Sequence, residues 1–374
     1  MTLLNESPIA QVVVKLTQRC NLNCSYCYVY NRGDLGYLQK PSFMSVEIFE
    51  ALLHRMHAYC AARPGHKIGL IFHGGEPMLM PASVFDRFAT MVTSVMGKTI
   101  DYMTVQTNGT LASEDWIAVL QKHEVSVGVS LDGPEDVHDR ARVDHTGKGS
   151  YRLVANGLKN FQEAGLLTSV ICVINPGESG LDCYRHIQTI GVKRINFLLP
   201  DATHDSKPFY YPNCGETPIA DFLIPIFDEW FNDDDPSIRI PIFNDVLRKL
   251  LGGHAEVDSI GGSFGAYIVI DTDGTIQPLD VLNICDRTPA GKRPNVATSA
   301  IEDVWQAYFS NWNGADRPCA ICKDCREFLI CGGGYLPHRF SRSRGFDNPS
   351  IWCKDLFRFV QHVRHALISV HENK

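Results

Sequence analysis

The sequence predicts an α/β fold built as an open, partial (β/α)6 barrel of the TIM type. Short runs rich in β-branched residues alternate with helix-like stretches through the first half of the chain, which is typical of parallel βαβ units. The sequence contains six such units, too few for a closed barrel of eight strands. We therefore expect an open barrel whose functional residues lie in the loops after the strands.

The elements of this barrel follow from the periodicity of apolar residues. The strand candidates are Val12–Leu16, Ile68–Phe72, Tyr102–Thr107, Val125–Ser130, Thr168–Val173 and Arg194–Leu199. The helix candidates between them are Val46–Arg63, Ala82–Val95, Ser113–Gln121, Tyr151–Ala164 and Leu181–Thr189. Because parallel strands end at the same edge of a sheet, the motifs that follow them are expected to meet there.

The pattern changes after about residue 205. A connector is indicated by Pro208, Pro212, Cys214 and Pro218. Bridging helices are then predicted at Phe222–Phe231 and Asn244–Leu251, and Ala266–Asp280 contains two strand runs around an Asp-Gly turn, which indicates a hairpin. We expect three parts: a barrel over residues 8–215, bridging helices over 216–258 and a C-terminal domain over 259–374.

Composition and charge exclude several classes of protein. The chain has 374 residues, of which 44% are hydrophobic and 21% charged, as in ordinary globular proteins. Neither an apolar stretch of membrane-spanning length nor a secretion signal is visible, so the sequence predicts a cytoplasmic protein without a membrane partner. The net charge of −7 and the scattered basic residues argue against nucleic acid as a partner.

Cysteine spacing points to metal chemistry. The chain has 13 cysteines, and their odd number and ligand-like spacing favour metal binding over disulfides. Cys20, Cys24 and Cys27 follow the first strand as C-x3-C-x2-C. Three thiolates can hold three irons of a [4Fe–4S] cluster and leave the fourth iron open for a small ligand. The alternatives are a structural zinc site or a chance group of buried thiols, but no second ligand pair follows closely.

The same loop resembles that of the radical S-adenosylmethionine (SAM) superfamily, with Tyr26 at the aromatic position of C-x3-C-x-aromatic-C. The resemblance implies a [4Fe–4S] cluster whose open iron binds the amino and carboxylate groups of SAM. Reductive cleavage of SAM to methionine then yields a 5′-deoxyadenosyl radical that abstracts hydrogen from the substrate. It also implies a partial (β/α)6 barrel and an electron donor such as flavodoxin or ferredoxin.

Motifs at the strand ends fit a bound ligand, although each alone is a common turn or helix cap. Glycines in His73-Gly-Gly-Glu-Pro77 allow close backbone approach, and a carboxylate or guanidinium can pair with a charged ligand group. The resemblance implies that Gly74, Gly75 and Glu76 contact the SAM amino group. It likewise assigns a ribose hydroxyl to Ser130 and the SAM carboxylate to Arg142. The full set of implied cofactor-binding residues is Tyr26, Gly74, Gly75, Glu76, Asn108, Ser130 and Arg142.

A second group of cysteines lies near the C-terminus: Cys319, Cys322, Cys325, Cys331 and Cys353. It resembles the SPASM extension of radical SAM peptide and protein maturases, so a SPASM/twitch-like iron–sulfur domain is implied. That pattern assigns Cys322, Cys325, Cys331 and Cys353 to one auxiliary [4Fe–4S] cluster, whose closed coordination suits electron transfer. Tyr335 and Leu279 stand where the full extension has further cysteines, so we expect no second auxiliary cluster. The alternative replacement ligands are Cys285, Cys214 and Cys319.

Asp280 is the candidate catalytic residue. It follows the degraded cysteine position at Leu279, where sulfatase maturases carry a carboxylate that removes a substrate proton. A general base of this kind has to face the reacting carbon or its neighbouring heteroatom. The alternative is an exposed aspartate at the end of a hairpin.

The stretch from Cys331 to Arg339, with three consecutive glycines, resembles the cyclophane-forming FxsB/GrrM-like branch more than the related anaerobic sulfatase maturases. The expected activity is that of a radical SAM oxidoreductase acting on a ribosomally synthesised precursor peptide (a RiPP maturase). It would abstract a side-chain β-hydrogen and form an aromatic-to-Cβ crosslink, a cyclophane. The alternatives are a sulfatase-type maturase that oxidises Cys or Ser to formylglycine and a non-catalytic iron–sulfur redox or sensor protein.

Overall fold

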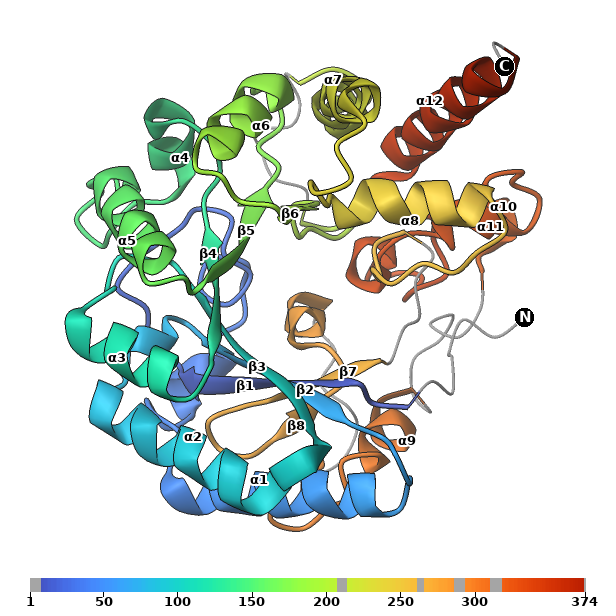
Figure 1. Cartoon of the computed structure of the whole chain (residues 1–374). Coiled ribbons are helices and arrows are strands. Elements are labelled where there is room, and N and C mark those ends of the chain that lie inside the picture. The colour runs from blue at the N-terminus through green and yellow to red at the C-terminus, as the bar shows by residue number, and fades with distance from the viewer. Residues whose placement is uncertain (1–7, 207–213, 261–265, 286–292, 310–317, 373–374) are drawn as a thin grey trace.

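A single sheet of eight strands organises the fold, in the order β6-β5-β4-β3-β2-β1-β7-β8 (Figure 1). The computed structural model describes residues 8–206, 214–260, 266–285, 293–309 and 318–372. Neighbouring strands from β1 to β6 pair in parallel, which confirms the predicted α/β partial barrel. Their bounds are β1 Gln11–Thr17, β2 Ile68–Gly74, β3 Ile100–Thr107, β4 Ser126–Ser130, β5 Leu167–Val173 and β6 Ile195–Leu198.

Six helices follow the barrel strands and cover the outer face of the sheet (Figure 1). They are α1 Val46–Ala61, α2 Ala82–Met96, α3 Glu114–Lys122, α4 Glu135–Ala141, α5 Tyr151–Glu163 and α6 Gly180–Thr189. Serine side chains cap three of them: Ser45 before α1, Ser113 before α3 and Ser179 before α6 each accept a backbone N–H of the first turn. These caps fix where each helix starts and therefore where each preceding loop ends.

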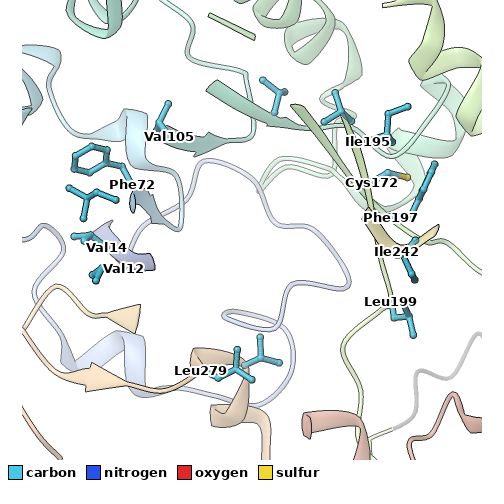
Figure 2. Close-up of a cluster of buried hydrophobic side chains, with 14 of the residues drawn as sticks. Val12, Val14, Phe72, Val105, Cys172, Ile195, Phe197, Leu199, Ile242 and Leu279 are labelled. Atoms are coloured by element: carbon cyan, nitrogen blue, oxygen red, sulfur yellow. The ribbon is translucent and has the colours of Figure 1, made fainter. Parts of the chain in front are cut away.

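The core lies between the sheet and these helices. Val12 and Val14 of β1 lie beside Phe72 of β2, and all three side chains are fully buried (Figure 2). The Phe72 ring packs edge-on against Phe85 of α2, with ring centroids 4.8 Å apart. Continuous apolar runs in β1 and β2 therefore reflect strands that are covered by helices.

The C-terminal part of the chain extends the same sheet. Strand β7, Tyr267–Ile270, pairs in parallel with β1, and β8, Ile276–Gln277, returns antiparallel to β7. Gly274 has φ of +81° in the turn, which favours glycine and confirms the predicted hairpin. Because β7 joins the barrel sheet, the structure does not separate the chain into two sheets near residue 259. The three-part division stays a prediction.

The remaining helices follow β6 in the sequence, and the last three of them carry members of the second cysteine group. They are α7 Pro218–Asp233, α8 Pro241–Leu250, α9 Asp303–Phe309, α10 Ala320–Lys323, α11 Phe328–Cys331 and α12 Cys353–Glu372. Asp355 of α12 accepts the backbone N–H groups of Ile219 and Ala220 at 2.7 and 3.1 Å, which joins α12 to the start of α7. The predicted connector prolines Pro208 and Pro212 lie outside the described residues. Within the described chain, no helix has the length and apolar character needed to cross a bilayer.

Candidate functional site

Three cysteines gather in the loop after β1. Cys24 is 9% exposed, and Cys20 and Cys27 are half-buried. Burial, the carboxylate of Glu76 and the other two thiols together raise the pKa of Cys20 to about 12. The Leu22 N–H donates to the Cys20 sulfur at 3.4 Å, a contact that would stabilise negative charge on that sulfur. A bound metal replaces the thiol protons and neutralises the charge of the thiolates that form. These buried thiols therefore suit a metal cluster as ligands.

The glycine turn after β2 packs directly against this loop. Gly74 has φ of +140°, and a Cβ there would lie 2.4 Å from the carbonyl oxygen of Thr17. A Cβ on Gly75 would lie 2.0 Å from the Tyr30 hydroxyl and 2.3 Å from the carbonyl oxygen of Arg19. Both positions therefore require glycine because the turn and the cysteine loop touch through their backbones.

Replacing Gly75 by Ala is expected to destabilise the fold by about 1–3 kcal/mol, because the new methyl group must displace the cysteine loop. The same displacement should lower the iron retained after anaerobic reconstitution. Urea unfolding and iron analysis measure the two effects. Gly253→Ala is the control, since its nearest atom, the Arg248 carbonyl oxygen, is 3.2 Å away. Equal stability and iron content in the two variants would contradict the expectation.

Glu76 ties the end of β2 to the end of β3. Its side chain is 0% exposed, and Oε1 accepts the Met78 N–H at 2.9 Å and the Thr107 hydroxyl at 2.7 Å. Oε2 accepts the Asn108 N–H at 2.7 Å, and the Asn108 amide nitrogen lies 3.9 Å from the sulfur of Cys20. The carboxylate thus builds the turn, and contact of Glu76 with a ligand amine stays a prediction.

Arg142 and Ser130 lie at neighbouring positions of the same edge. Arg142 is 7% exposed and donates to the Tyr26 hydroxyl at 2.6 Å, and Tyr26 in turn donates to Asp132 at 2.6 Å. Burial lowers the pKa of Arg142, but Tyr26, Cys24 and Asp132 raise it well above its usual value, so the guanidinium is charged. Its buried Nε has no hydrogen-bond partner within the described chain, which fits the predicted carboxylate contact. The Ser130 hydroxyl accepts a hydrogen bond from a β3 side-chain amide at 3.1 Å.

Asp280 is not an exposed hairpin residue, because it is 6% exposed and faces β1. Its Oδ2 lies 2.7 Å from the Lys15 ammonium and accepts the Tyr28 hydroxyl at 2.7 Å. Burial raises the pKa of Asp280, but Lys15 and the other polar groups around the carboxylate together lower it by more, so the pKa lies below its usual value. His73 adds to this lowering, and its own Nδ1 is buried without a partner among the described atoms.

Lys15 and Tyr28 were missed as site residues by the sequence reasoning. Lys15 lies in β1, is 4% exposed and also approaches Asp271 at 3.5 Å. A lysine inside an otherwise apolar buried strand was the available signal, because a buried ammonium needs a carboxylate partner. Nothing in the sequence said which carboxylate that would be.

The five C-terminal cysteines form one group. Cys319 and Cys322 are buried, and the other three are half-buried. Burial, a hydrogen bond with Cys319 and the neighbouring thiols of Cys331 and Cys353 all raise the pKa of Cys322. The pKa of Cys353 is raised by burial and by Cys325 and Cys319. The structure thus brings together the four predicted auxiliary ligands and adds Cys319.

The two groups of cysteines fit iron–sulfur clusters better than they fit single metal ions. In the described ranges no three His, Cys, Asp or Glu side chains are arranged to hold one metal ion. A cubane cluster takes one thiolate on each iron, so its ligands need not converge on one ion. Tyr335 stands at one of the two positions where the full SPASM extension has a further cysteine. It interacts with Tyr267, whose hydroxyl donates to Asp258 at 3.0 Å. Hydroxyl and carboxyl groups therefore occupy that region, and Leu279 is a buried apolar side chain there.

Comparison with known families identifies the chemistry. Residues 14–190 match the model of the Radical SAM superfamily, and this range contains the three-cysteine loop, the glycine turn, Ser130 and Arg142. The chain is a radical SAM oxidoreductase. The predicted cofactors, SAM with a [4Fe–4S] cluster that has an open iron and an auxiliary [4Fe–4S] cluster, agree with this match and with the two groups of thiols.

Relatives of this radical SAM oxidoreductase match it from end to end. It is 24% identical to the "Cysteine-type anaerobic sulfatase-maturating enzyme" of Clostridium perfringens, over 98% of this chain and 99% of the relative. It is 27% identical to the "Serine-type anaerobic sulfatase-maturating enzyme" of Bacteroides thetaiotaomicron, over 95% of this chain and 89% of the relative.

Solved structures show the same fold. The structure of "native anSMEcpe with bound AdoMet and Cp18Cys peptide" matches with a TM-score of 0.82 at 22% identity, over 97% of this chain and 99% of that chain. The structure of Streptococcus suis SuiB bound to its precursor peptide SuiA matches with a TM-score of 0.63 at 15% identity, over 94% of this chain and 77% of that chain.

The predicted cyclophane-forming activity and its FxsB/GrrM-like branch are wrong, because these end-to-end relatives are named sulfatase-maturating enzymes. The misleading signal was the glycine run after Cys331. Gly333 and Gly334 have φ of +88° and +76°, and a Cβ on Gly334 would lie 2.9 Å from the Ser350 side chain. Backbone conformation and close packing beside a cysteine are therefore sufficient to explain the run.

Proposed function

We propose that this radical SAM oxidoreductase is an anaerobic sulfatase-type maturase, which oxidises a Cys or Ser side chain of a peptide or protein to formylglycine. The observation that carries the proposal is the end-to-end similarity to sulfatase-maturating enzymes of both the cysteine and the serine type. A buried, ion-paired carboxylate at Asp280 supports it, because oxidation of a thiol or alcohol needs a group that accepts the proton of the heteroatom.

Each part of the site has a role in this reaction. Cys20, Cys24 and Cys27 would hold the cluster that binds SAM, and together the two cofactors supply hydrogen-atom abstraction when bound. Arg142 would bind the SAM carboxylate through its free Nε, held in place by Tyr26. The turn built by Glu76 would present its backbone to the SAM amino group.

Asp280 would accept the substrate proton on Oδ1. Its Oδ2 already accepts from Tyr28 and pairs with Lys15, whereas Oδ1 accepts no hydrogen bond from the described part of the chain. The substrate β-carbon loses a hydrogen atom, its heteroatom gives a proton to Asp280, and one electron leaves. A serine then becomes the aldehyde directly, and a cysteine becomes a thioaldehyde that water hydrolyses with release of hydrogen sulfide.

Cys322, Cys325, Cys331 and Cys353 would hold the auxiliary cluster, whose closed coordination suits uptake of an electron. A peptide segment is the proposed substrate partner, and a flavodoxin or ferredoxin the proposed electron donor. In this proposal residues 8–215 bind SAM and residues 259–374 hold the auxiliary cluster. Residues 216–258 connect these two parts.

Anaerobic turnover with SAM, dithionite and peptides that carry a single Cys or Ser tests the function. We expect 5′-deoxyadenosine together with a peptide carbonyl that a hydrazide probe traps. Peptides with Ala at the same position control for background labelling. A crosslinked peptide without a carbonyl would contradict the proposal, and absence of 5′-deoxyadenosine would favour a non-catalytic iron–sulfur protein.

A further inference from the structure

The side chain of Arg142 is held by a relay of two short hydrogen bonds. Arg142 donates to the Tyr26 hydroxyl at 2.6 Å, and that hydroxyl donates to Oδ2 of Asp132, also at 2.6 Å. Asp132 is 2% exposed and follows β4, and its Oδ1 accepts the Val173 N–H of β5 at 3.0 Å. The relay therefore joins the cysteine loop, the end of β4 and the end of β5 to one guanidinium.

The direction of each hydrogen bond in this relay follows from the groups that make it. A guanidinium and a backbone N–H can only donate, so the Tyr26 oxygen and Oδ1 of Asp132 must accept. The Tyr26 proton then points to Oδ2 of Asp132, which leaves a lone pair of the hydroxyl for Arg142. Burial raises the pKa of Asp132, and the charge of Arg142 opposes this rise. A carboxylate that accepts from Tyr26 makes the hydroxyl oxygen a better acceptor for the guanidinium.

A second chain of hydrogen bonds holds the backbone of Arg142. The Asp132 N–H donates to Nδ1 of His138 at 3.3 Å, and Nε2 of His138 lies 3.1 Å from the Ser150 hydroxyl. Ser150 donates to the Arg142 carbonyl at 2.7 Å. Burial and Arg142 lower the pKa of His138 to about 3, so the ring is neutral and carries its proton on Nε2. The backbone and the guanidinium of Arg142 are thus both tied to Asp132.

We propose that Asp132 is a positioning residue that aims the guanidinium of Arg142 at the carboxylate of SAM through Tyr26. Nε of Arg142 is buried and has no partner in the described chain, so a donor remains for that carboxylate while Tyr26 holds the guanidinium. A side chain that is fixed before the ligand arrives loses little conformational freedom on binding, which strengthens the contact. The inference rests on the SAM contact of Arg142 in the proposed function, but not on the substrate or its oxidation.

Asp132→Asn isolates this role because Val173 fixes the orientation of the new amide. The amide oxygen has to accept the Val173 N–H, so the amide nitrogen takes the place of Oδ2 and faces the Tyr26 hydroxyl with a donor. The Tyr26 proton then loses its acceptor, and the hydroxyl is no longer oriented toward Arg142. Tyr26→Phe removes the same link from its other end.

The test measures dissociation constants by equilibrium dialysis with the full-length, anaerobically reconstituted protein in the absence of a reductant, so that SAM is not cleaved. The ligands are SAM and decarboxylated SAM, which lacks the group that Arg142 would bind. We expect Asp132→Asn and Tyr26→Phe each to weaken SAM binding by roughly tenfold, the effect of one hydrogen bond to a charged group, with little change for decarboxylated SAM. In a Tyr26→Phe background, Asp132→Asn should have little further effect, because both changes act through one hydroxyl.

Asp136→Asn is the matched control, because Asp136 is an exposed residue of α4 that pairs with Arg140. Its affinities for both ligands should equal those of the wild type. Arg142→Met is the reference and should lose the preference for SAM over decarboxylated SAM. If Asp132→Asn is too unstable to measure, Tyr26→Phe decides by the same comparison.

Equal weakening of both ligands in Asp132→Asn and Tyr26→Phe would overturn the inference, because it would show a structural role alone. A preference that is lost in Arg142→Met but kept in Asp132→Asn and Tyr26→Phe would also overturn it, and the SAM contact of Arg142 would stand. An unchanged preference in Arg142→Met would remove that contact, and the positioning role with it. Formylglycine formation is not a readout, so none of these outcomes depends on the proposed reaction.

Discussion

Replacing Cys24 by Ala is expected to abolish SAM cleavage, whereas Cys325→Ala is expected to leave part of it without product. Cys24 lies in the loop after β1 beside Arg142 and next to the thiol of Cys20. Loss of one of these thiols should prevent assembly of the cluster that binds SAM. Cys325 belongs to the separate C-terminal group, so its loss should interrupt electron removal and leave cleavage uncoupled from oxidation.

Quantification of 5′-deoxyadenosine and of trapped peptide carbonyl in the same anaerobic reactions separates these outcomes. Cys60→Ala is the matched control, because Cys60 is a buried core residue of α1 that belongs to neither thiol group. It should leave both yields close to those of the wild type. Equal loss of cleavage in the Cys24 and Cys325 variants would argue against two clusters with different roles.

The strand ends of this fold were predictable because local patterns determine them. β-branched runs followed by Gly, Asn or Ser located the ends of β2, β3 and β4, where His73-Gly-Gly-Glu, Asn108 and Ser130 lie. In a parallel sheet these ends meet at one edge, so the grouping of the predicted residues follows from topology. Helix α12 was not predicted, and its contact with the start of α7 joins Asp355 to Ile219, 136 positions earlier in the chain.

Partners that are distant in the sequence were not predictable. The ion pair of Lys15 with Asp280 joins the first strand to the C-terminal hairpin, and it arises only because β7 pairs with β1. The burial of Glu76 depends on the Asn108 N–H of the neighbouring strand end. Cys319 was considered for a second cluster, but the turn of α10 places it with Cys322.

Asp280→Asn is expected to retain SAM cleavage and to lower formylglycine formation by roughly 10²- to 10⁴-fold, the usual contribution of a general base. The amide cannot accept the substrate proton, but it preserves the shape of the side chain and can still accept from Tyr28. The ratio of carbonyl product to 5′-deoxyadenosine measures the effect. A variant with an unchanged ratio would exclude Asp280 as the base.

The pH dependence of the same ratio should reveal the role of Lys15. Lys15 holds the pKa of Asp280 below its usual value, so the base is ionised at neutral pH, and product formation should fall only as the solution is acidified through that lowered pKa. Lys15→Met removes this effect, so the acid limb of the profile should move to higher pH.

The stability that ionised Asp280 contributes is present above its unfolded-state pKa and is lost as the pH falls through the lowered folded-state pKa. The Lys15→Met variant should therefore also lose stability at neutral pH. Lys40→Met is the control, because Lys40 pairs with Asp271 and not with Asp280. Identical acid limbs in the two variants would show that Lys15 does not tune the base.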